Sequence, residues 1–282
     1  MPMKKSSTLS KCDISIVIVN YNTGNILTKC LDSIYKTTNN LSTPKSEIIA
    51  IDNASTDNSF TSLKEKRSLK FIQNSQNVGF AKAVNQGIKK AKSKHVLLLN
   101  PDTEVRPEAI NTLLEFAQTN PDAGVIGARL VNPDGSTQPS VFHLPTLIGA
   151  IKEYWFGVKN SFSKYIPQGK TPTQVEALVM AAFLITPKGF KRVGLLNEKF
   201  FMYFEDLDYC KRIRKAGLKI YYLPNAEIIH YHGVSGKSLA DQKDQWRRLV
   251  PSSKIYHGKL NHYLINSVLW SAQKWQRLFS KT

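Results

Sequence analysis

Between Ile14 and Ala117, four short apolar segments alternate with segments whose apolar residues have helical spacing. This rhythm of strand and helix predicts an α/β fold, with a mostly parallel sheet and helices on both of its faces. The apolar run Val96–Leu99 suits a strand that is buried on both faces of that sheet. We predict strands at residues 14–19, 47–51, 69–73 and 96–99, and helices at residues 25–35, from about Ser59, at 81–91 and at 109–117.

Polar residues follow three of these predicted strands at the point where each strand ends. They are Asn20 after the first strand, Asp52 and Asn53 after the second, and Asn100 and Asp102 after the fourth. Open α/β sheets bind their ligands at the edge formed by the carboxyl ends of the strands. We therefore expect these side chains to converge on one edge of the sheet.

Asp102 allows two interpretations from its own surroundings. An acid at this edge can bind a divalent cation, and the cation can in turn bind a diphosphate. The segment Asn100-Pro101-Asp102 also consists of residue types that favour turns, so it can be a turn and nothing more. The segment alone leaves both interpretations open.

The second half of the chain is less regular. Residues 139–172 contain prolines and bulky aromatic residues without a clear period, and we interpret them as a long excursion, mobile or partly helical, that serves function. Acidic residues at the start of the segment from Asp206 and basic residues near its end match a helix dipole, and Gly217 suits its end. We predict strands at residues 124–131, 175–185 and 219–223, the last ended by Pro224, and a helix at residues 206–215.

The charge of the chain points to an anionic partner. The formal net charge is +18 and the isoelectric point is near 9.7, which fits nucleic acid, an acidic membrane surface or phosphorylated substrates. The three scattered cysteines fit unpaired thiols in a reducing compartment. No apolar run approaches the roughly 18 residues of a membrane span. We therefore expect a cytoplasmic protein that can rest on the inner face of the membrane.

The ends of the chain differ from its middle. Residues 1–12 have the character of a flexible tail. Residues 238–282 carry eight Lys or Arg against two acids, with three tryptophans among them, and suggest an amphipathic helical extension. Such a segment suits an anionic bilayer surface, but it can equally pack on the preceding domain or form a dimer. The remaining residues, 13–237, form the predicted main domain.

Six polar motifs occur along the main domain, and together they resemble glycosyltransferase family 2, the large inverting family with the GT-A fold. The rhamnosyltransferase-like subgroup is the nearest match, and the resemblance extends over about residues 13–237. The motifs are Asn20-Tyr21-Asn22, Asp52-Asn53-Ala54-Ser55-Thr56-Asp57, Asn77-Val78-Gly79-Phe80 with Asn85, Asn100-Pro101-Asp102-Thr103, Phe200-Phe201-Met202-Tyr203-Phe204-Glu205-Asp206, and His230-Tyr231-His232-Gly233.

The resemblance implies an enzyme that moves a sugar from a nucleotide-sugar, linked to dTDP or UDP, to a hydroxyl group of a glycan or a lipid-linked glycan precursor. The subgroup suggests L-rhamnose from dTDP-L-rhamnose in the synthesis of a cell-surface polysaccharide. A catalytically inactive module that binds a nucleotide or carbohydrate on the same fold is the alternative. A nucleic-acid binder is permitted by the charge, but no motif supports it.

The resemblance also implies roles for individual residues. Asp206 is the expected general base, and Glu205 is expected to orient the acceptor or Asp206, or to be the base itself. Asp102 is the expected ligand of Mg²⁺ or Mn²⁺ together with His230, for which His232 is the alternative. The nucleotide-sugar is expected to contact Asn20, Tyr21, Asp52, Asn53, Gly79, Asn85, Asn100 and Asp102. Asn85 can instead lie on a polar helix face, and Gly79 is expected to let the backbone approach the nucleotide.

The chain departs from the family pattern at three places. Asn100 stands where many members have the first aspartate of the metal motif, which leaves one carboxylate instead of two. Mg²⁺ can be held by one or two carboxylates together with substrate phosphates. Ala181-Ala182 and Asn197-Glu198 replace Gly-Ala and Asp-Glu, at positions expected near the donor sugar or the acceptor.

Overall fold

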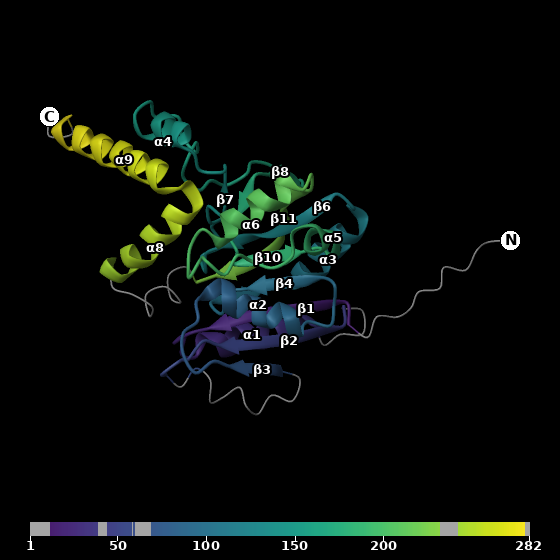
Figure 1. The fold of residues 1–282 in the computed structure, drawn as a ribbon. Coiled ribbons are helices and arrows are strands. Elements are labelled where there is room, and N and C mark those ends of the chain that lie inside the picture. The colour runs from purple at the N-terminus through teal and green to yellow at the C-terminus, as the bar shows by residue number, and fades with distance from the viewer. Residues whose placement is uncertain (1–11, 39–43, 58, 60–68, 232–241, 280–282) are drawn as a thin grey trace.

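One mixed β-sheet, with helices on both faces, forms the body of the protein (Figure 1). The structure, a computed structural model, describes residues 12–38, 44–57, 59, 69–231 and 242–279. Within these residues, nine strands form this sheet in the order β3-β2-β1-β4-β10-β6-β11-β5, and β8 pairs with β11. The mostly parallel α/β architecture predicted from the sequence is confirmed.

The first half of the chain folds as its alternating pattern predicts. Strands β3, β2, β1 and β4 are parallel neighbours, as expected for strands joined by helices. The elements are β1 (Ile14–Asn20), α1 (Ile26–Thr38), β2 (Ser46–Asp52), β3 (Leu69–Gln73), α2 (Phe80–Lys90), β4 (Val96–Leu99) and α3 (Ala109–Thr119). The helix expected from Ser59 falls almost wholly outside the described residues.

Strand β1 is buried along its whole length because both of its faces are covered. Ile16 and its alternate neighbours pack in the same core cluster as Leu27 and Leu31 of α1. Val17 packs in a second cluster with Val84 of α2. Side chains of a strand alternate between the faces of a sheet, so the continuous apolar run is what a central strand between two helical layers requires.

The predicted strand at residues 175–185 is wrong in its extent, because the structure divides it into three. These are β8 (Thr173–Val175), β9 (Ala177–Leu178) and β10 (Ala182–Ile185). Strand β8 pairs with β11, whereas β10 lies antiparallel between β4 and β6 (Ala123–Val131). The chain therefore changes its partner strands within a few residues, which a single straight strand cannot do. Strand β9 pairs instead with β7 (Val141–Phe142) in a separate ribbon.

Strand β11 (Lys219–His230) continues through Pro224, so the prediction that Pro224 ends it is wrong. The pairing with β6 shifts register between Leu223 and Glu227, and this irregularity accommodates a residue that has no N–H to donate. The last residues of β11 pair with β5 (Thr103–Val105), a short strand that the sequence pattern did not reveal. That pairing places the end of β11 beside Asp102.

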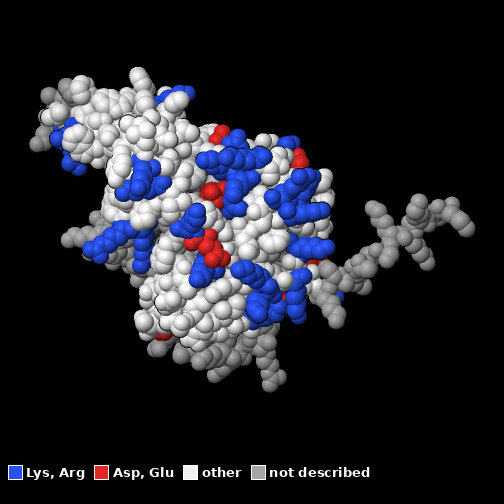
Figure 2. Space-filling view, viewed as in Figure 1, with Lys and Arg blue, Asp and Glu red and all other residues white. Residues whose placement is uncertain are grey.

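Helices surround the later strands. The excursion at residues 139–172 is partly helical, as predicted, and contains α4 (Leu147–Tyr154). Helix α5 (Pro187–Val193) precedes α6 (Glu205–Lys215), after which Gly217 has a φ of +74°, as its predicted place at a helix end requires. On the face shown in Figure 2, Lys and Arg side chains gather over α5 and α6.

The C-terminal extension forms two helices, α8 (Gln242–His257) and α9 (Lys259–Phe279), that project from one end of the body beside α4 (Figure 1). The rings of Trp155 and Trp275 lie 6.0 Å apart between α4 and α9. Within the described part of the chain, no helix is both long and apolar enough to cross a bilayer. The predicted boundaries of the main domain, at residues 13 and 237, stay a prediction, and residues 1–11 and 232–241 lie outside the described residues.

Candidate active site

The polar strand ends converge on one edge of the sheet, as predicted. Asn20 and Asp52 are register partners on β1 and β2, and Asn20 Nδ2 donates to Asp52 Oδ1 at 3.0 Å. A cavity of about 430 Å³ opens at this edge, beside the start of α6. Five residues predicted for the site line it, namely Tyr21, Asn53, Asn100, Glu205 and Asp206.

The other predicted residues lie outside the cavity wall. They are Asn20, Asp52, Gly79, Asn85, Asp102 and His230. Asp52 is buried and accepts hydrogen bonds from Asn20 and from the hydroxyl of Ser55 at 2.5 Å. Its carboxylate thus fixes the loop after β2, immediately before Asn53, which is in the wall. Asn53 in turn donates to Asn77 Oδ1 at 2.8 Å, and Asn77 also lines the cavity.

Gly79 makes a close contact with another part of the chain. Its φ is +86°, and a Cβ added to it would lie 2.8 Å from the carbonyl oxygen of Phe201. The next residue, Phe80, donates its N–H to that same oxygen at 2.7 Å. The close approach that Gly79 permits is therefore to the segment before α6, and the approach to a nucleotide expected at Gly79 stays a prediction.

The segment before α6 has a strained backbone. Tyr203 and Phe204 have φ values of +71° and +67°, in the left-handed region that costs a non-glycine residue about 1 kcal/mol or more. Helix α8 supports this turn, because Ser252 Oγ donates to the carbonyl of Met202 at 2.7 Å. The ring of Phe204 also packs 5.3 Å from that of Tyr256. The turn delivers two consecutive acids, Glu205 and Asp206, to the cavity.

Burial raises the pKa of both acids at the start of α6. The pKa of Glu205 is raised first by desolvation and then by the charge of Asp206, and its buried Oε2 has no hydrogen-bond partner among the described residues. Desolvation also raises the pKa of Asp206, but the Leu207 N–H, 2.8 Å away, and Lys164 oppose this rise. When two coupled acids share one environment, the better-solvated and better-bonded one ionises first. The pKa of Asp206 is therefore raised less than that of Glu205, so Asp206 is expected to lose its proton first.

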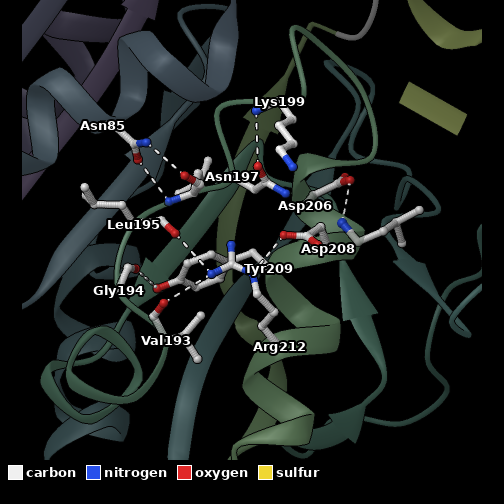
Figure 3. Close-up of polar contacts among 12 residues, drawn as sticks. Asn85, Val193, Gly194, Leu195, Asn197, Lys199, Asp206, Asp208, Tyr209 and Arg212 are labelled. Atoms are coloured by element: carbon white, nitrogen blue, oxygen red, sulfur yellow. Dashed lines mark hydrogen bonds and ion pairs between the residues drawn. The ribbon is translucent and has the colours of Figure 1, made fainter. Parts of the chain in front are cut away.

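Asn85 holds a loop in place (Figure 3). Its amide donates to the Leu196 carbonyl at 2.9 Å and to Glu198 Oε1 at 3.0 Å, and it accepts from the Leu196 N–H at 3.0 Å. Asn85 is buried, so its amide does not face solvent. Its predicted contact with the nucleotide-sugar stays a prediction, and its observed contacts are to the 193–199 loop.

Helix α6 holds the same loop from the other side. Arg212 donates to the carbonyls of Val193 and Leu195 at 3.2 and 3.1 Å, while Asp208 Oδ2 accepts from Arg212 Nε at 2.8 Å (Figure 3). The departure from the family pattern at Asn197-Glu198 falls in this loop. Asp208 therefore forms an ion pair with Arg212 that has a structural role.

Asp102 and His230 face each other at the end of β11. Asp102 Oδ1 lies 3.5 Å from His230 Nε2, and both residues are buried. Gln138 Nε2 donates to the His230 carbonyl at 2.6 Å, so its Oε1 must be the acceptor 2.9 Å from His230 Nδ1. Nδ1 therefore carries a proton, and in neutral His230 the lone pair of Nε2 is directed toward the carboxylate.

Three residues of the cavity wall come from later segments and were not predicted from the sequence. Lys164 comes from the excursion between α4 and β8, and Arg248 and Leu249 come from α8. The bias of both segments toward basic and aromatic residues signalled a functional role. Their irregular or one-sided patterns gave no information about which part of the sheet they would contact.

Similarity to known proteins identifies the fold and the family of this chain. The sequence profile described as "Glycosyl transferase family 2" matches residues 15–183, which is more than half of the chain. The chain belongs to glycosyltransferase family 2. The match includes the strand ends at Asn20, Asp52 and Asn100, so this edge of the sheet lies in the part that defines the family.

Two curated relatives and one solved structure extend this comparison. The N-acetylglucosaminyl-diphospho-decaprenol L-rhamnosyltransferase of Mycobacterium tuberculosis is 29% identical over 238 residues, which cover 77% of this chain and 76% of that relative. The dTDP-rhamnosyl transferase RfbF of Shigella flexneri is 22% identical over 66% of this chain and 60% of its own length. The crystal structure of GalNAc-T7 with UDP, GalNAc and Mn²⁺ matches 78% of this chain and 44% of that chain, with a TM-score of 0.58 and 19% identity.

The similarity to the GalNAc-T7 structure shows that this family 2 member has the GT-A-like fold. Within that fold, the described residues contain no group of three or more His, Cys, Asp or Glu side chains that could hold a metal ion. The pair Asp102 and His230 nevertheless supplies an oxygen and a nitrogen donor whose imidazole is oriented by Gln138, as second-shell groups orient metal-bound histidines. A carboxylate oxygen and an imidazole nitrogen placed in this way are compatible with a divalent cation.

Proposed function

We propose that this glycosyltransferase moves L-rhamnose from dTDP-L-rhamnose to a hydroxyl group of a lipid-linked glycan precursor in the synthesis of a cell-surface polysaccharide. The observation that carries the proposal is the similarity to the Mycobacterium tuberculosis enzyme, which extends over about three quarters of both chains. Its name specifies L-rhamnose as the transferred sugar and N-acetylglucosaminyl-diphospho-decaprenol as the acceptor. The name of the Shigella flexneri relative adds dTDP as the nucleotide.

The acids at the start of α6 support an inverting single displacement. The acceptor oxygen forms a bond to the anomeric carbon while the bond from that carbon to the donor diphosphate breaks. The hydroxyl proton passes to the carboxylate of Asp206, which lines the cavity and ionises before Glu205. Glu205 positions Asp206, and because it keeps its proton it adds no second negative charge beside the base. The products are the glycoside and dTDP.

The opposite wall of the cavity suits the nucleotide. Tyr21, Asn53 and Asn100 lie there, at the carboxyl ends of β1, β2 and β4, where open α/β sheets bind nucleotides. Asn20 and Asp52 do not line the cavity. Their mutual hydrogen bond fixes the loop that places Asn53 in the cavity wall. These five residues, rather than a single motif, form the proposed donor side.

The proposed metal site is the pair Asp102 and His230. A bound Mg²⁺ or Mn²⁺ would neutralise negative charge on the donor diphosphate. Asp102 would hold it through Oδ1 and His230 through Nε2, with Gln138 keeping the imidazole in the required tautomer. His232, the alternative ligand, lies outside the described residues. Lys164 and Arg248 provide further positive charge at the cavity for the diphosphates of donor or acceptor.

A panel of nucleotide-sugars tests this proposal in two steps. Thermal unfolding of the full chain is measured with dTDP-L-rhamnose, dTDP-glucose, UDP-glucose and UDP-N-acetylglucosamine, each with and without Mn²⁺. Release of dTDP is then measured after addition of N-acetylglucosaminyl-diphospho-polyprenol. We expect the largest rise in unfolding temperature with dTDP-L-rhamnose and Mn²⁺, and dTDP release that depends on the acceptor.

Other outcomes would change the assignment. A larger shift with a UDP-sugar would replace the proposed donor. Binding of dTDP-L-rhamnose without release of dTDP, for any glycan acceptor, would favour the alternative of an inactive binding module. Turnover that depends on the donor but is insensitive to chelators would transfer the metal's role to Lys164 and Arg248.

A further inference from the structure

Exposed hydrophobic side chains are concentrated on one projecting part of the molecule. We define the C-terminal arm as α4 with residues 155–158, together with α8 and α9. Among the described residues, all but two of the exposed large hydrophobic side chains lie on it, the exceptions being Phe190 and Phe201. Those on the arm are Ile148, Trp155, Phe156, Val158, Trp246, Leu249, Ile255, Leu260, Tyr263, Leu264, Trp270, Trp275 and Leu278.

Helix α9 carries apolar side chains on its packed face and also on its exposed side. One face carries Ile265 and Ala272, which are 4% and 2% exposed, and packs against α4 and α8. The exposed side of the helix presents a stripe of large side chains, formed by Leu260, Tyr263, Leu264, Trp270 and Leu278, and Trp275 lies at its edge beside Trp155 of α4. Large apolar side chains that gather on one exposed surface commonly mark a binding site.

The charges of α9 indicate what binds there. The helix contains Lys259, Lys274 and Arg277 but no aspartate or glutamate. Lys274 Nζ lies 4.3 Å from the ring centre of Trp270, and Lys254 of α8 lies 5.0 Å from that of Tyr263, so cations border the aromatic stripe. Figure 2 shows the arm as a largely uncharged surface with a few basic patches.

We propose that the C-terminal arm docks onto an anionic lipid bilayer. Aromatic and leucine side chains enter the boundary between headgroups and acyl chains, and neighbouring Lys and Arg side chains bind anionic headgroups, as in interfacial amphipathic helices. A second copy of the chain is the less suitable occupant, because two such arms would bring positively charged helices together in a protein of net charge +18. This docking is independent of the proposed donor and acceptor.

Docking in this manner would place the cavity at the membrane surface. Helix α8 belongs both to the arm, through the exposed Trp246, and to the cavity wall, through Arg248 and Leu249. A lipid-linked acceptor would therefore meet the cavity without leaving the bilayer. The structural link between the two surfaces is a single helix, so no further domain is needed to join them.

The tryptophans of the chain provide a direct measurement. All four lie on the arm and are 44–60% exposed, so tryptophan fluorescence, excited selectively over that of tyrosine, reports on the arm alone. Vesicles of phosphatidylcholine with phosphatidylglycerol, and vesicles of phosphatidylcholine alone, are titrated into the full chain, with brominated lipid as quencher. We expect a blue shift and quenching with the anionic vesicles, and affinity at least about tenfold weaker for the neutral ones.

Variants separate docking from other causes. The triple variant Phe156→Ser, Leu260→Gln, Leu278→Gln changes only exposed side chains of the arm and should weaken vesicle affinity about tenfold or more. The matched control is Phe190→Ser, an exposed phenylalanine on α5, which should leave affinity unchanged. Absence of fluorescence change with anionic vesicles would overturn the proposal. A concentration-dependent dimer in sedimentation experiments, abolished by the triple variant, would assign the stripe to a second copy instead.

Discussion

Ser252 on α8 donates its hydroxyl proton to the backbone carbonyl of Met202, with 2.7 Å between the two oxygens. This bond joins the C-terminal extension to the strained turn that presents Glu205 and Asp206. Tyr203 and Phe204, the two left-handed residues, lie between Met202 and the acids. The extension therefore fixes the backbone on which the proposed general base depends.

Removing this hydroxyl tests that dependence. Ser252→Ala should lower the free energy of unfolding by about 1–2 kcal/mol, since a buried hydrogen bond is lost. It should also reduce kcat about fivefold, because the turn no longer holds Asp206 as firmly. The control is Ser253→Ala, which removes a hydrogen bond to His262 instead and should cost stability without a comparable fall in kcat. Equal kcat values in the two variants would show that the contact between α8 and the turn does not affect catalysis.

The acids at the start of α6 should respond differently to neutralisation. Asp206→Asn should lower kcat by about 10²–10⁴-fold, the usual contribution of a general base, while donor binding measured by calorimetry changes little. Asp208→Asn, two residues later, removes only the partner of Arg212 and should retain most of the turnover. Near wild-type turnover in Asp206→Asn would place the base elsewhere.

Glu205 should make stability depend on pH. Burial raises its pKa in the folded protein, so the folded state binds more protons than the unfolded state once pH exceeds the ordinary pKa of glutamate. Its stabilising contribution is complete below that ordinary pKa and is lost as pH rises through the raised value. Glu205→Gln should therefore unfold at a higher temperature than wild type at alkaline pH, and at a similar one near pH 4. Glu115→Gln, on the exposed side of α3, should leave the pH profile unchanged.

The proposed metal site predicts a joint loss of cation and nucleotide binding. Asp102→Asn keeps the size of the side chain but removes its charge, so the Mn²⁺-dependent part of the thermal shift with dTDP should disappear. His230→Gln should have the same effect. Glu104→Gln alters a nearby carboxylate that binds Tyr231, and it should keep the full Mn²⁺ response. A normal Mn²⁺ response in both site variants would remove Asp102 and His230 from metal binding.

The sequence was sufficient for the layered architecture and for the edge that carries the site. Apolar runs such as Ile14–Val19 and Val96–Leu99 report burial on both faces, and parallel strands necessarily bring their carboxyl ends together. The sequence alone therefore assigns Asn20, Asp52 and Asn100 to one edge. The order of the polar motifs along the chain also predicted the family.

Tertiary structure alone decided which of these residues face the cavity. Asn85 contacts Leu196, 111 residues away, and Gly79 contacts Phe201, whereas a periodic pattern carries information only about neighbours along the chain. The insertion of β10 between β4 and β6, and the approach of α8 to Met202, likewise depend on packing between distant segments. Local sequence determines which face of an element is buried, but the partner that buries it is chosen by the shape and polarity of the whole folded chain.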